Sequence, residues 1–255
     1  MNLKKKVAHQ PFSCELEGAT TAVIFIHGIL EGPYQFHGLA EKILDQGMSF
    51  GILLPGHGGS AREFAKSHRK QWIKYVNCQI EEISKKYPQI ILVGHSMGTL
   101  LSLLVCEKHE AVVGVVCLAT PLSVKVSLKG FVCSLKVLTG HYSQDDEYVL
   151  ASYRAWSISK GTWGDYLKWI PRYLDLFHLI YETKKQLPMI KKPLLFIHCQ
   201  CDEFVRNRTT KILKKGDNYE LIELCKSGHF YYRGDESQTL EQAILKFVTQ
   251  FKVDN

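Results

Sequence analysis

The sequence predicts an α/β protein built on a doubly wound, mostly parallel sheet. Two observations lead to this prediction. Short apolar runs, rich in β-branched residues and bounded by glycine or proline, recur along the chain, as expected for strands buried on both faces of a parallel sheet. Segments with apolar residues at helical spacing separate these runs, and this alternation is typical of a parallel sheet covered by helices.

The individual elements follow in chain order. The clearest strand candidates are 22–26, 90–93, 112–118 and 194–197. Two weaker candidates are 50–54, which ends at Pro55, and 219–224. Helices are predicted over 36–44, over a stripe from Trp72 to Ile83 that stops before Pro88, and over 240–251. Strand and helix therefore alternate in both the first and the last part of the chain.

One long segment interrupts this alternation. No strand is evident over 122–192, and residues 142–181 contain six Tyr, three Trp and one Phe. Pro171 must begin a new helix there or kink an existing one. A connection this long inside a compact domain is usually functional. We therefore expect 122–192 to form a helical cap on a core made of 1–121 and 193–255, with aromatic side chains that line a pocket or form the small core of the cap.

Composition and charge exclude several classes of protein. The chain has 255 residues, of which 45% are hydrophobic and 22% charged, an ordinary globular balance. The net charge of +7 is modest and its basic residues are scattered, so we expect no nucleic-acid partner. The start, Met1–Pro11, has no apolar run, so no secretory signal is expected. No window reaches the roughly 18 apolar residues needed to cross a bilayer, so no stable membrane insertion is expected.

The eight cysteines do not form a disulfide framework. Cys78, Cys106 and Cys117 lie in apolar patterns, where a cysteine is usually a small buried hydrophobe. Cys199 and Cys201 form a pair that is too close for ordinary bridge geometry and has no second pair at zinc-site spacing. We therefore expect no metal site and a reducing, cytoplasmic location.

The stretch Gly94-His95-Ser96-Met97-Gly98 carries the strongest chemical signal in the chain. It has the pattern G-x-S-x-G, directly after a predicted strand and before a helical run. A serine on such a sharp strand-to-helix turn points its hydroxyl out of the sheet, and the tight backbone admits only small flanking residues. The helix N-terminus behind it also favours developing negative charge. The pattern therefore predicts Ser96 as a nucleophile.

A serine hydroxyl needs a base, and the base needs an orienting acid. On a sheet of this kind the chain order is serine, acid, histidine. Asp202 follows the strand candidate 194–197 in a loop at the carboxyl end of the sheet, and Glu203 beside it is the less favoured alternative. His229 follows the strand candidate 219–224, in a loop before the last helix. These positions predict Asp202 as the acid and His229 as the base.

The oxyanion of a tetrahedral intermediate needs hydrogen-bond donors. One donor should be the backbone N–H that follows the nucleophile, which belongs to Met97. The second should come from the loop after an early strand, where His27, Gly28 and Ile29 lie. We assign it to the N–H of Ile29 and expect His27 to support the loop without touching substrate.

These motifs, taken in order, resemble the α/β-hydrolase superfamily. They are His27-Gly28, Leu54-Pro55-Gly56-His57-Gly58, the elbow at Ser96, Asp202 with Val205, and Ser227-Gly228-His229. The resemblance covers nearly the whole chain, is weakest over 122–192, and is greatest to small bacterial carboxylesterases and monoacylglycerol lipases. It implies the same triad, a helical cap inserted after the sixth strand, and short- to medium-chain acyl esters or monoglycerides as substrates. Two places depart from the family pattern, namely Arg206, where proline is frequent, and residues 30–34.

The sequence thus predicts a serine esterase that works through an acyl-enzyme on Ser96, without a metal or organic cofactor. Its expected substrate is a small ester with an apolar acyl or aryl group. The same triad would serve an acyltransferase, a thioesterase or a hydrolase of amides, lactones or activated C–C bonds, because the triad fixes acyl transfer and not the acceptor. A non-catalytic ligand-binding protein is the least favoured alternative. The aromatic cap could also expose an apolar patch for a homodimer or a lipid surface.

Overall fold

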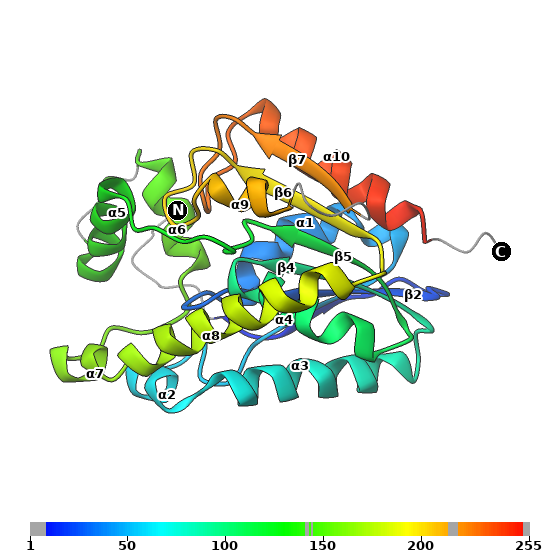
Figure 1. The fold of residues 1–255 in the computed structure, drawn as a ribbon, viewed down its shortest axis with the longest axis horizontal. Helices are drawn as coiled ribbons and strands as arrows, with labels where there is room; N and C mark the ends of the chain where they lie inside the picture. Colours follow the sequence, from blue (N-terminus) through cyan, green and yellow to red (C-terminus); the bar gives the residue numbers. More distant parts are fainter. Residues whose placement is uncertain (1–8, 141–142, 144, 214–218, 252–255) are drawn as a thin grey trace.

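The computed structural model describes residues 9–140, 143, 145–213 and 219–251. Within these residues the strands form a seven-stranded sheet of order β1-β3-β2-β4-β5-β6-β7 (Figure 1). The strands are β1 (Phe12–Cys14), β2 (Thr21–Ile26), β3 (Met48–Ile52), β4 (Gln89–His95), β5 (Val112–Leu118), β6 (Leu194–Cys199) and β7 (Tyr219–Leu224). Only β1 runs antiparallel to its neighbour in this sheet, so the predicted mostly parallel α/β fold is confirmed.

Helices connect the strands. The α-helices are α1 (His37–Lys42), α2 (Ala61–Lys66), α3 (Arg69–Ser84), α4 (Met97–Val105), α5 (Leu128–Thr139), α6 (Glu147–Ala155), α7 (Trp163–Leu167), α8 (Ile170–Gln186), α9 (Arg208–Leu213) and α10 (Asp235–Thr249). Short 3₁₀ helices are η1 (Pro33–Phe36), η2 (Leu44–Gln46), η3 (Cys106–Lys108) and η4 (Leu187–Met189).

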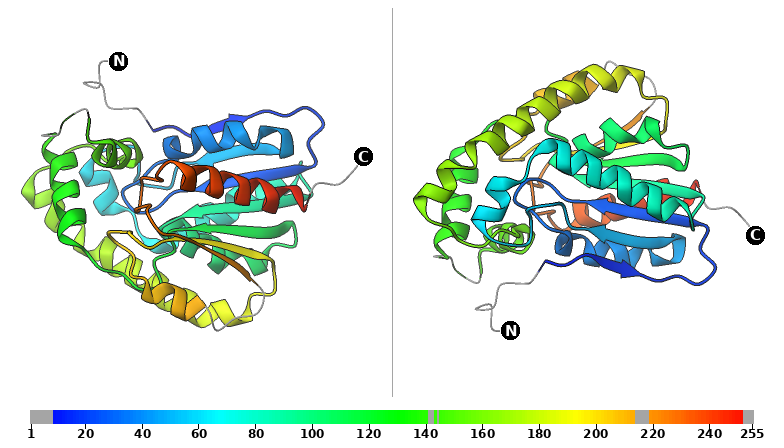
Figure 2. Two further views of the ribbon diagram at one scale, coloured as in Figure 1. Left: turned by 90° about the horizontal axis from the view of Figure 1, so that it is seen from above. Right: turned by 90° about the horizontal axis from the view of Figure 1, so that it is seen from below.

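The sheet is covered on both faces because its strands are apolar on both faces. In β2, Ile24 and Ile26 belong to one apolar cluster, whereas Val23 and Phe25 belong to the other. The first cluster includes residues of α3, α4 and α8, and the second includes residues of α10 and of the segment around α1. Figure 2 shows α1 and α10 in front of the sheet in one view, and α3 and α8 in front of it in the opposite view. This arrangement is the doubly wound architecture that the sequence predicts.

Three local features differ from the sequence prediction. The antiparallel strand β1 was not predicted, because three residues of mixed polarity give no run to recognise. The helix expected over 36–44 is broken into η1, α1 and η2. Cys78 is exposed, whereas the sequence predicted it to be a buried hydrophobe. None of the eight cysteines forms a disulfide. Pro171, by contrast, lies in the first turn of α8 and so begins a new helix, one of the two outcomes expected for it.

Four α-helices, α5 to α8, lie between β5 and β6. They follow the fifth of the seven strands in the described sheet, whereas the family resemblance implied an insertion after the sixth. In Figure 1, α5, α6 and α7 lie together at one end of the molecule. The longer α8 packs against α4 and α3, so it also contributes to the helical layer over the sheet. How the chain divides into core and cap therefore stays a prediction. Residues 1–8, 214–218 and 252–255 of the proposed core, and 141, 142 and 144 of the proposed cap, lie outside the described residues.

The inserted helices carry an exposed apolar surface. The large exposed hydrophobic side chains of the described chain all lie between Val126 and Met189. On α7 and α8, Trp163 is 86% exposed and Phe177 is 53% exposed. None of the described helices is both long and apolar enough to span a bilayer.

Candidate active site

The site lies where the winding of the sheet reverses. Strand β2 pairs with β3 on one side and with β4 on the other, so the connections that leave β2 and β4 diverge at the carboxyl ends of these strands. Ligands of open α/β sheets bind in the crevice that such a reversal creates. Register places Ile26 at the end of β2 opposite Gly94 in β4. The loop with Gly28 and the turn with Ser96 therefore leave the sheet side by side.

Ser96 occupies a strained turn between β4 and α4. Its φ and ψ are 51° and −121°, a conformation that non-glycine residues avoid. The glycines on either side permit this turn, because an added Cβ at Gly94 would lie 2.6 Å from the backbone nitrogen of Thr99. At Gly98 an added Cβ would lie 1.9 Å from the carbonyl oxygen of Ile26. The turn predicted from G-x-S-x-G is thus present, with Ser96 at the N-terminus of α4.

Asp202 and His229 are brought together from two different loops. Nδ1 of His229 lies 2.7 Å from Oδ2 of Asp202 and donates a hydrogen bond to it. The other carboxylate oxygen, Oδ1, accepts the backbone N–H groups of Phe204 and Val205, both at 2.7 Å. Asp202 is 1% exposed and His229 3% exposed. The aspartate is therefore held on one side by the backbone and presents the other side to the imidazole.

The charges in this pair shift both groups away from their ordinary pKa values. Burial raises the pKa of Asp202, but the positive charge and hydrogen bond of His229 outweigh it, so the net shift is downward. Burial lowers the pKa of His229, but the charge and hydrogen bond of Asp202, followed by the charges of Glu31 and Glu203, raise it above 6.5. The arrangement stabilises an aspartate next to an imidazolium.

Glu203 contacts the main chain of His229 and not its imidazole. Its Oε2 accepts the backbone N–H of His229 at 3.1 Å, and its Oε1 lies 3.0 Å from Nζ of Lys129 in α5. The sequence left Glu203 as the less favoured orienting acid. In the structure it is Asp202 whose carboxylate faces Nδ1, while Glu203 joins the histidine loop to an inserted helix.

The other face of the imidazole shows a feature that sequence reasoning missed. No hydrogen bond joins Oγ of Ser96 to Nε2 of His229 within the described residues. The carboxylate of Glu31 lies near this nitrogen, with Oε1 3.9 Å from Nε2. A lone glutamate in a loop has no diagnostic spacing, although an acidic residue between the apolar Ile29-Leu30 and Gly32-Pro33 is a weak signal in retrospect.

The expected oxyanion donors are available. The backbone N–H groups of Ile29 and Met97 donate to no acceptor within the part of the chain that the structure describes, whereas Gly28 N–H already donates to Glu31 at 2.6 Å. His27 fixes this loop, since its Nε2 accepts the N–H of Leu54 at 3.0 Å and its Nδ1 donates to the carbonyl of Gly28 at 2.9 Å. Burial lowers the pKa of His27 well below 6.5, which keeps it neutral for this role.

The loop after β2 and the loop after β6 both make backbone hydrogen bonds to the inserted segment. The backbone N–H of Gly32 donates to Ala155 at the end of α6, and that of Ser157 donates to Leu30, at 3.0 and 2.9 Å. At the start of the insertion, the N–H of Ser127 donates to the carbonyl of Glu203 at 3.0 Å. The inserted helices therefore border the site next to the proposed oxyanion loop and next to the acid.

One cluster has the donor atoms of a metal site. Glu31, His95 and His229 are buried, and one ligand atom from each lies within 4.8 Å of the others. Carboxylate and imidazole suit transition metals. However, Oε2 of Glu31 and Nδ1 of His95 are already hydrogen-bonded to each other at 2.8 Å. We therefore assign these two residues to a hydrogen-bonded pair and not to a metal centre.

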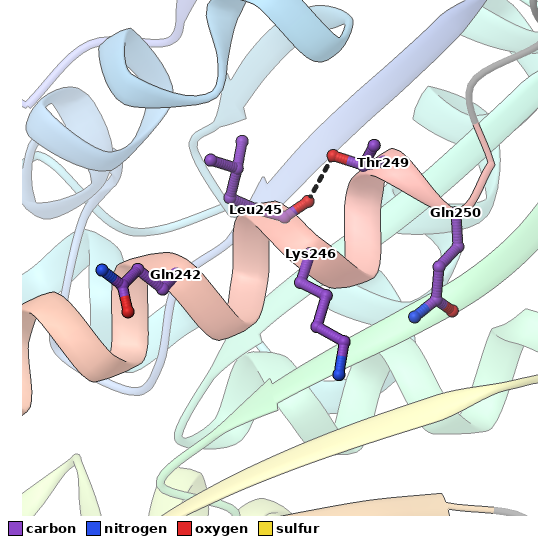
Figure 3. A pocket seen from close by; sticks show the side chains of 5 residues that line it. All are labelled: Gln242, Leu245, Lys246, Thr249 and Gln250. Atoms are coloured by element: carbon purple, nitrogen blue, oxygen red, sulfur yellow. Dashed lines mark hydrogen bonds between the residues drawn. The ribbon is translucent and has the colours of Figure 1, made fainter.

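A surface hollow on α10 lies outside this site. Figure 3 shows it, and it is lined by Gln242, Leu245, Lys246, Thr249 and Gln250. All of these residues belong to one helix or its end, and the hydroxyl of Thr249 donates to the carbonyl of Leu245 within that helix. The lining contains no histidine, cysteine or carboxylate to activate Lys246 or Thr249, so we do not assign the hollow a catalytic role.

Known proteins resemble this chain in sequence pattern and in fold. A family model described as serine aminopeptidase, S33, matches residues 18–223. No curated protein matches in a sequence search. Among solved structures, one of the metagenome-derived lipolytic enzymes LipS and LipT is similar, with a TM-score of 0.73, 17% identity, and coverage of 95% of this chain and 98% of that one.

Two further structures share the fold at low identity. Paleococcus ferrophilus monoacylglycerol lipase has a TM-score of 0.68 and 17% identity, with 94% of this chain and 99% of that one covered. The esterase EaEST from Exiguobacterium antarcticum has a TM-score of 0.60 and 16% identity, with 93% and 94% covered. These likenesses show the fold, and the family model covers most of the sequence. The chain therefore belongs to the serine aminopeptidase S33 family of the α/β-hydrolase superfamily.

Proposed function

We propose that the protein is a carboxylic-ester hydrolase that acts through an acyl-enzyme on Ser96. The observation that carries the proposal is the joint placement of three groups at one edge of the sheet. Ser96 lies on a strained turn with φ 51°, and the bonded pair of His229 and Asp202 comes from the loops after β7 and β6. A nucleophile, a base and an orienting acid in this order are the parts that serine acyl transfer needs.

The proposed reaction begins with attack of Ser96 Oγ on the ester carbonyl. His229 Nε2 takes the hydroxyl proton, and Asp202 stabilises the resulting imidazolium through its 2.7 Å hydrogen bond to Nδ1. The N–H groups of Met97 and Ile29 donate to the oxyanion. The alcohol leaves with the proton from His229, and water then repeats the sequence on the acyl-enzyme. In an enzyme without substrate the bond between nucleophile and base is often long, so its absence here is compatible with this scheme.

The surroundings of His229 favour an apolar group on the substrate. The ring of Phe204 lies 5.1 Å and that of Phe230 4.7 Å from the imidazole, both edge to face. The inserted segment makes hydrogen bonds to both site loops. It also contains more than half of the tryptophan and tyrosine residues of the chain, taken together. We propose that this segment acts as a cap and that it selects an apolar acyl or aryl ester, because such a group gains from contact with aromatic walls.

Hydrolysis of an amide bond is a second candidate. The matching family model is described as a serine aminopeptidase, and the same nucleophile, base and oxyanion donors cleave esters and amides alike. The two activities differ in the leaving group, since an amine must be protonated before it can depart. A pair of substrates with one acyl group, an ester and an anilide, separates them.

The test is hydrolysis of p-nitrophenyl esters from acetate to palmitate by the wild-type protein and by Ser96→Ala, with the p-nitroanilide of the best acyl group beside them. The proposal predicts turnover with an optimum in chain length, lost in the variant by a factor of about 10⁴ or more. Equal rates in the two proteins would contradict the acyl-enzyme on Ser96. Turnover of the anilide at a rate similar to that of the ester would favour the peptidase reading.

A further inference from the structure

A buried carboxylate, that of Glu31, lies at the centre of the candidate active site. Its side chain is 2% exposed. Oε2 accepts hydrogen bonds from the backbone N–H of Gly28 at 2.6 Å, from Nε2 of Gln35 at 2.8 Å and from Nδ1 of His95 at 2.8 Å. Oε1 lies 3.9 Å from Nε2 of His229. A carboxylate this deep is expensive to bury unless it is paired, and three donors on one oxygen provide that pairing.

His95 links this carboxylate to the base. Its Nδ1 faces Glu31, and its Nε2 lies 3.0 Å from the backbone carbonyl oxygen of His229. A carbonyl oxygen only accepts hydrogen bonds, and an ionised carboxylate does the same. Burial raises the pKa of Glu31, but the charge and hydrogen bond of His95 outweigh this effect and lower it. His95 therefore bridges the carboxylate of Glu31 and the main chain of His229 through its two ring nitrogens.

The space around Glu31 matches this role. An added Cβ at Gly28 would lie 2.3 Å from Oε1 of Glu31. The glycine of His27-Gly28 is therefore needed to admit the carboxylate as well as to form the turn. Because Gly28 N–H points at Glu31, the next amide in the loop, that of Ile29, remains for the oxyanion.

We propose that Glu31 and His95 are positioning residues of the active site, which join the oxyanion loop and the main chain of His229 in one hydrogen-bonded unit. This inference rests on the proposed serine hydrolase function. One end of the unit is the N–H of Gly28, next to the oxyanion donor Ile29. The other end is the carbonyl of His229. Glu31 thereby sets the distance between the base His229 and the oxyanion donor Ile29, which lie 200 residues apart in the sequence.

Glu31 also contributes to the electrostatic environment of the base. The charged and titratable groups around His229 are Asp202 and Glu203 from the loop after β6, Glu31 from the loop after β2, and His95 at the end of β4. Lys129 of α5 pairs with Glu203 and offsets its charge. Removal of the negative charge of Glu31 should therefore make protonation of His229 less favourable.

The variant Glu31→Gln keeps the shape of the side chain and removes its charge. The assay is ester hydrolysis, with kcat normalised to the concentration of titrated active sites. We expect kcat to fall by about 10²-fold while KM changes little, because a misplacement of about 1 Å between reacting groups has an effect of that size. The acidic limb of kcat/KM against pH should move to lower pH, since the imidazolium of His229 loses a neighbouring negative charge.

Two further variants separate positioning from a general loss of stability. His95→Asn breaks the same unit from the other side, so the double variant Glu31→Gln/His95→Asn should lose little more activity than the worse single variant. Asp165→Asn removes a buried carboxylate from the capping box of α7, which includes none of the groups around His229. This variant should lower the stability of the protein without moving the acidic limb of kcat/KM against pH.

The decisive experiment measures the rate at which a fluorophosphonate labels Ser96 as a function of pH, in the wild-type protein, Glu31→Gln and Asp165→Asn. The inference is supported if Glu31→Gln labels more slowly and the acidic limb of its labelling rate against pH is shifted, while Asp165→Asn shows neither change. Labelling of Glu31→Gln with the wild-type rate and limb would overturn it. If the wild-type protein does not label, the proposed function is wrong. In that case ¹⁵N spectra of the imidazoles still test the hydrogen-bonded unit, because the His95 Nδ1 that faces Glu31 should shift its resonance in Glu31→Gln and not in Asp165→Asn. An unchanged His95 resonance in Glu31→Gln would overturn the unit.

Discussion

The close approach of Gly98 in α4 to the end of β2 gives a sharp test of how the site is assembled. A Cβ added at Gly98 would lie 1.9 Å from the carbonyl oxygen and 2.6 Å from the carbonyl carbon of Ile26, and 2.8 Å from the carbonyl oxygen of His27. Ordinary contacts of a Cβ begin at 3.4 Å. The variant Gly98→Ala would therefore require α4 and β2 to separate by about 1.5 Å, and both sides of the contact are backbone.

The expected size of the effect follows from this overlap. Overpacking a core with side chains typically costs 1–3 kcal/mol, and backbone atoms at both sides leave less room to relax, so we expect Gly98→Ala to lose about 3 kcal/mol or more of the free energy of unfolding. The gain in helix propensity, about 1 kcal/mol, offsets only part of this loss. At an m-value of about 2 kcal/mol/M in urea, the unfolding midpoint should fall by at least about 1 M.

The matched control is Gly38→Ala in α1. Gly38 is exposed, and an added Cβ there would meet no atom within 4 Å. This variant should leave the urea midpoint unchanged or raise the stability by about 0.4–1 kcal/mol, because alanine restricts the unfolded chain. A Gly98→Ala protein whose midpoint equals that of the wild type would refute the packing of α4 on β2.

Four further predictions concern the base, the pH dependence of activity and of stability, and the N-cap of one helix. Asp202→Asn should lower kcat for the best p-nitrophenyl ester by about 10⁴-fold, because the amide holds His229 in the wrong tautomer. Although burial lowers the pKa of His229, Asp202 and the other carboxylates raise it above 6.5, so kcat/KM should rise with pH through a midpoint above 6.5; a midpoint below 6.5 in a pH-rate profile would contradict this. The same raised pKa contributes stability below 6.5 that is lost as pH rises through the folded-state pKa, as urea unfolding across this range should show. Ser60→Ala removes the N-cap of α2, where Ser60 and Glu63 form a capping box, and should cost about 1 kcal/mol in urea unfolding without changing kcat.

The parts of the fold that the sequence predicts well are those governed by burial on both faces. The runs that became β2, β4, β5 and β6 are apolar throughout because the sheet is covered by helices on each side. The strand β1 lies at the edge and pairs only with β3, so its three residues need no such run. Phe36, the last residue of η1, is buried in the second apolar cluster, and apolar periodicity alone does not distinguish this 3₁₀ turn from the α-helix that follows it.

The candidate site shows the same division. Ser96 directly follows a strand, and Asp202 and His229 each follow a strand and a short loop, so their positions can be predicted from local order along the chain. Glu31 and His95 are 64 residues apart, and their contact exists only because β2 and β4 are neighbours in the sheet. The role of Glu31 therefore depends on topology, and the sequence pattern around it predicts only a loop.

The most direct test of the central claim is covalent labelling of the wild-type protein by a fluorophosphonate, followed by mass spectrometry of the peptides. The account predicts one modified residue, Ser96, with labelling abolished in Ser96→Ala and strongly slowed in His229→Ala, because the hydroxyl needs the imidazole to lose its proton. Labelling at another residue, or labelling of Ser96 that is as fast without His229, would contradict the proposed serine hydrolase mechanism.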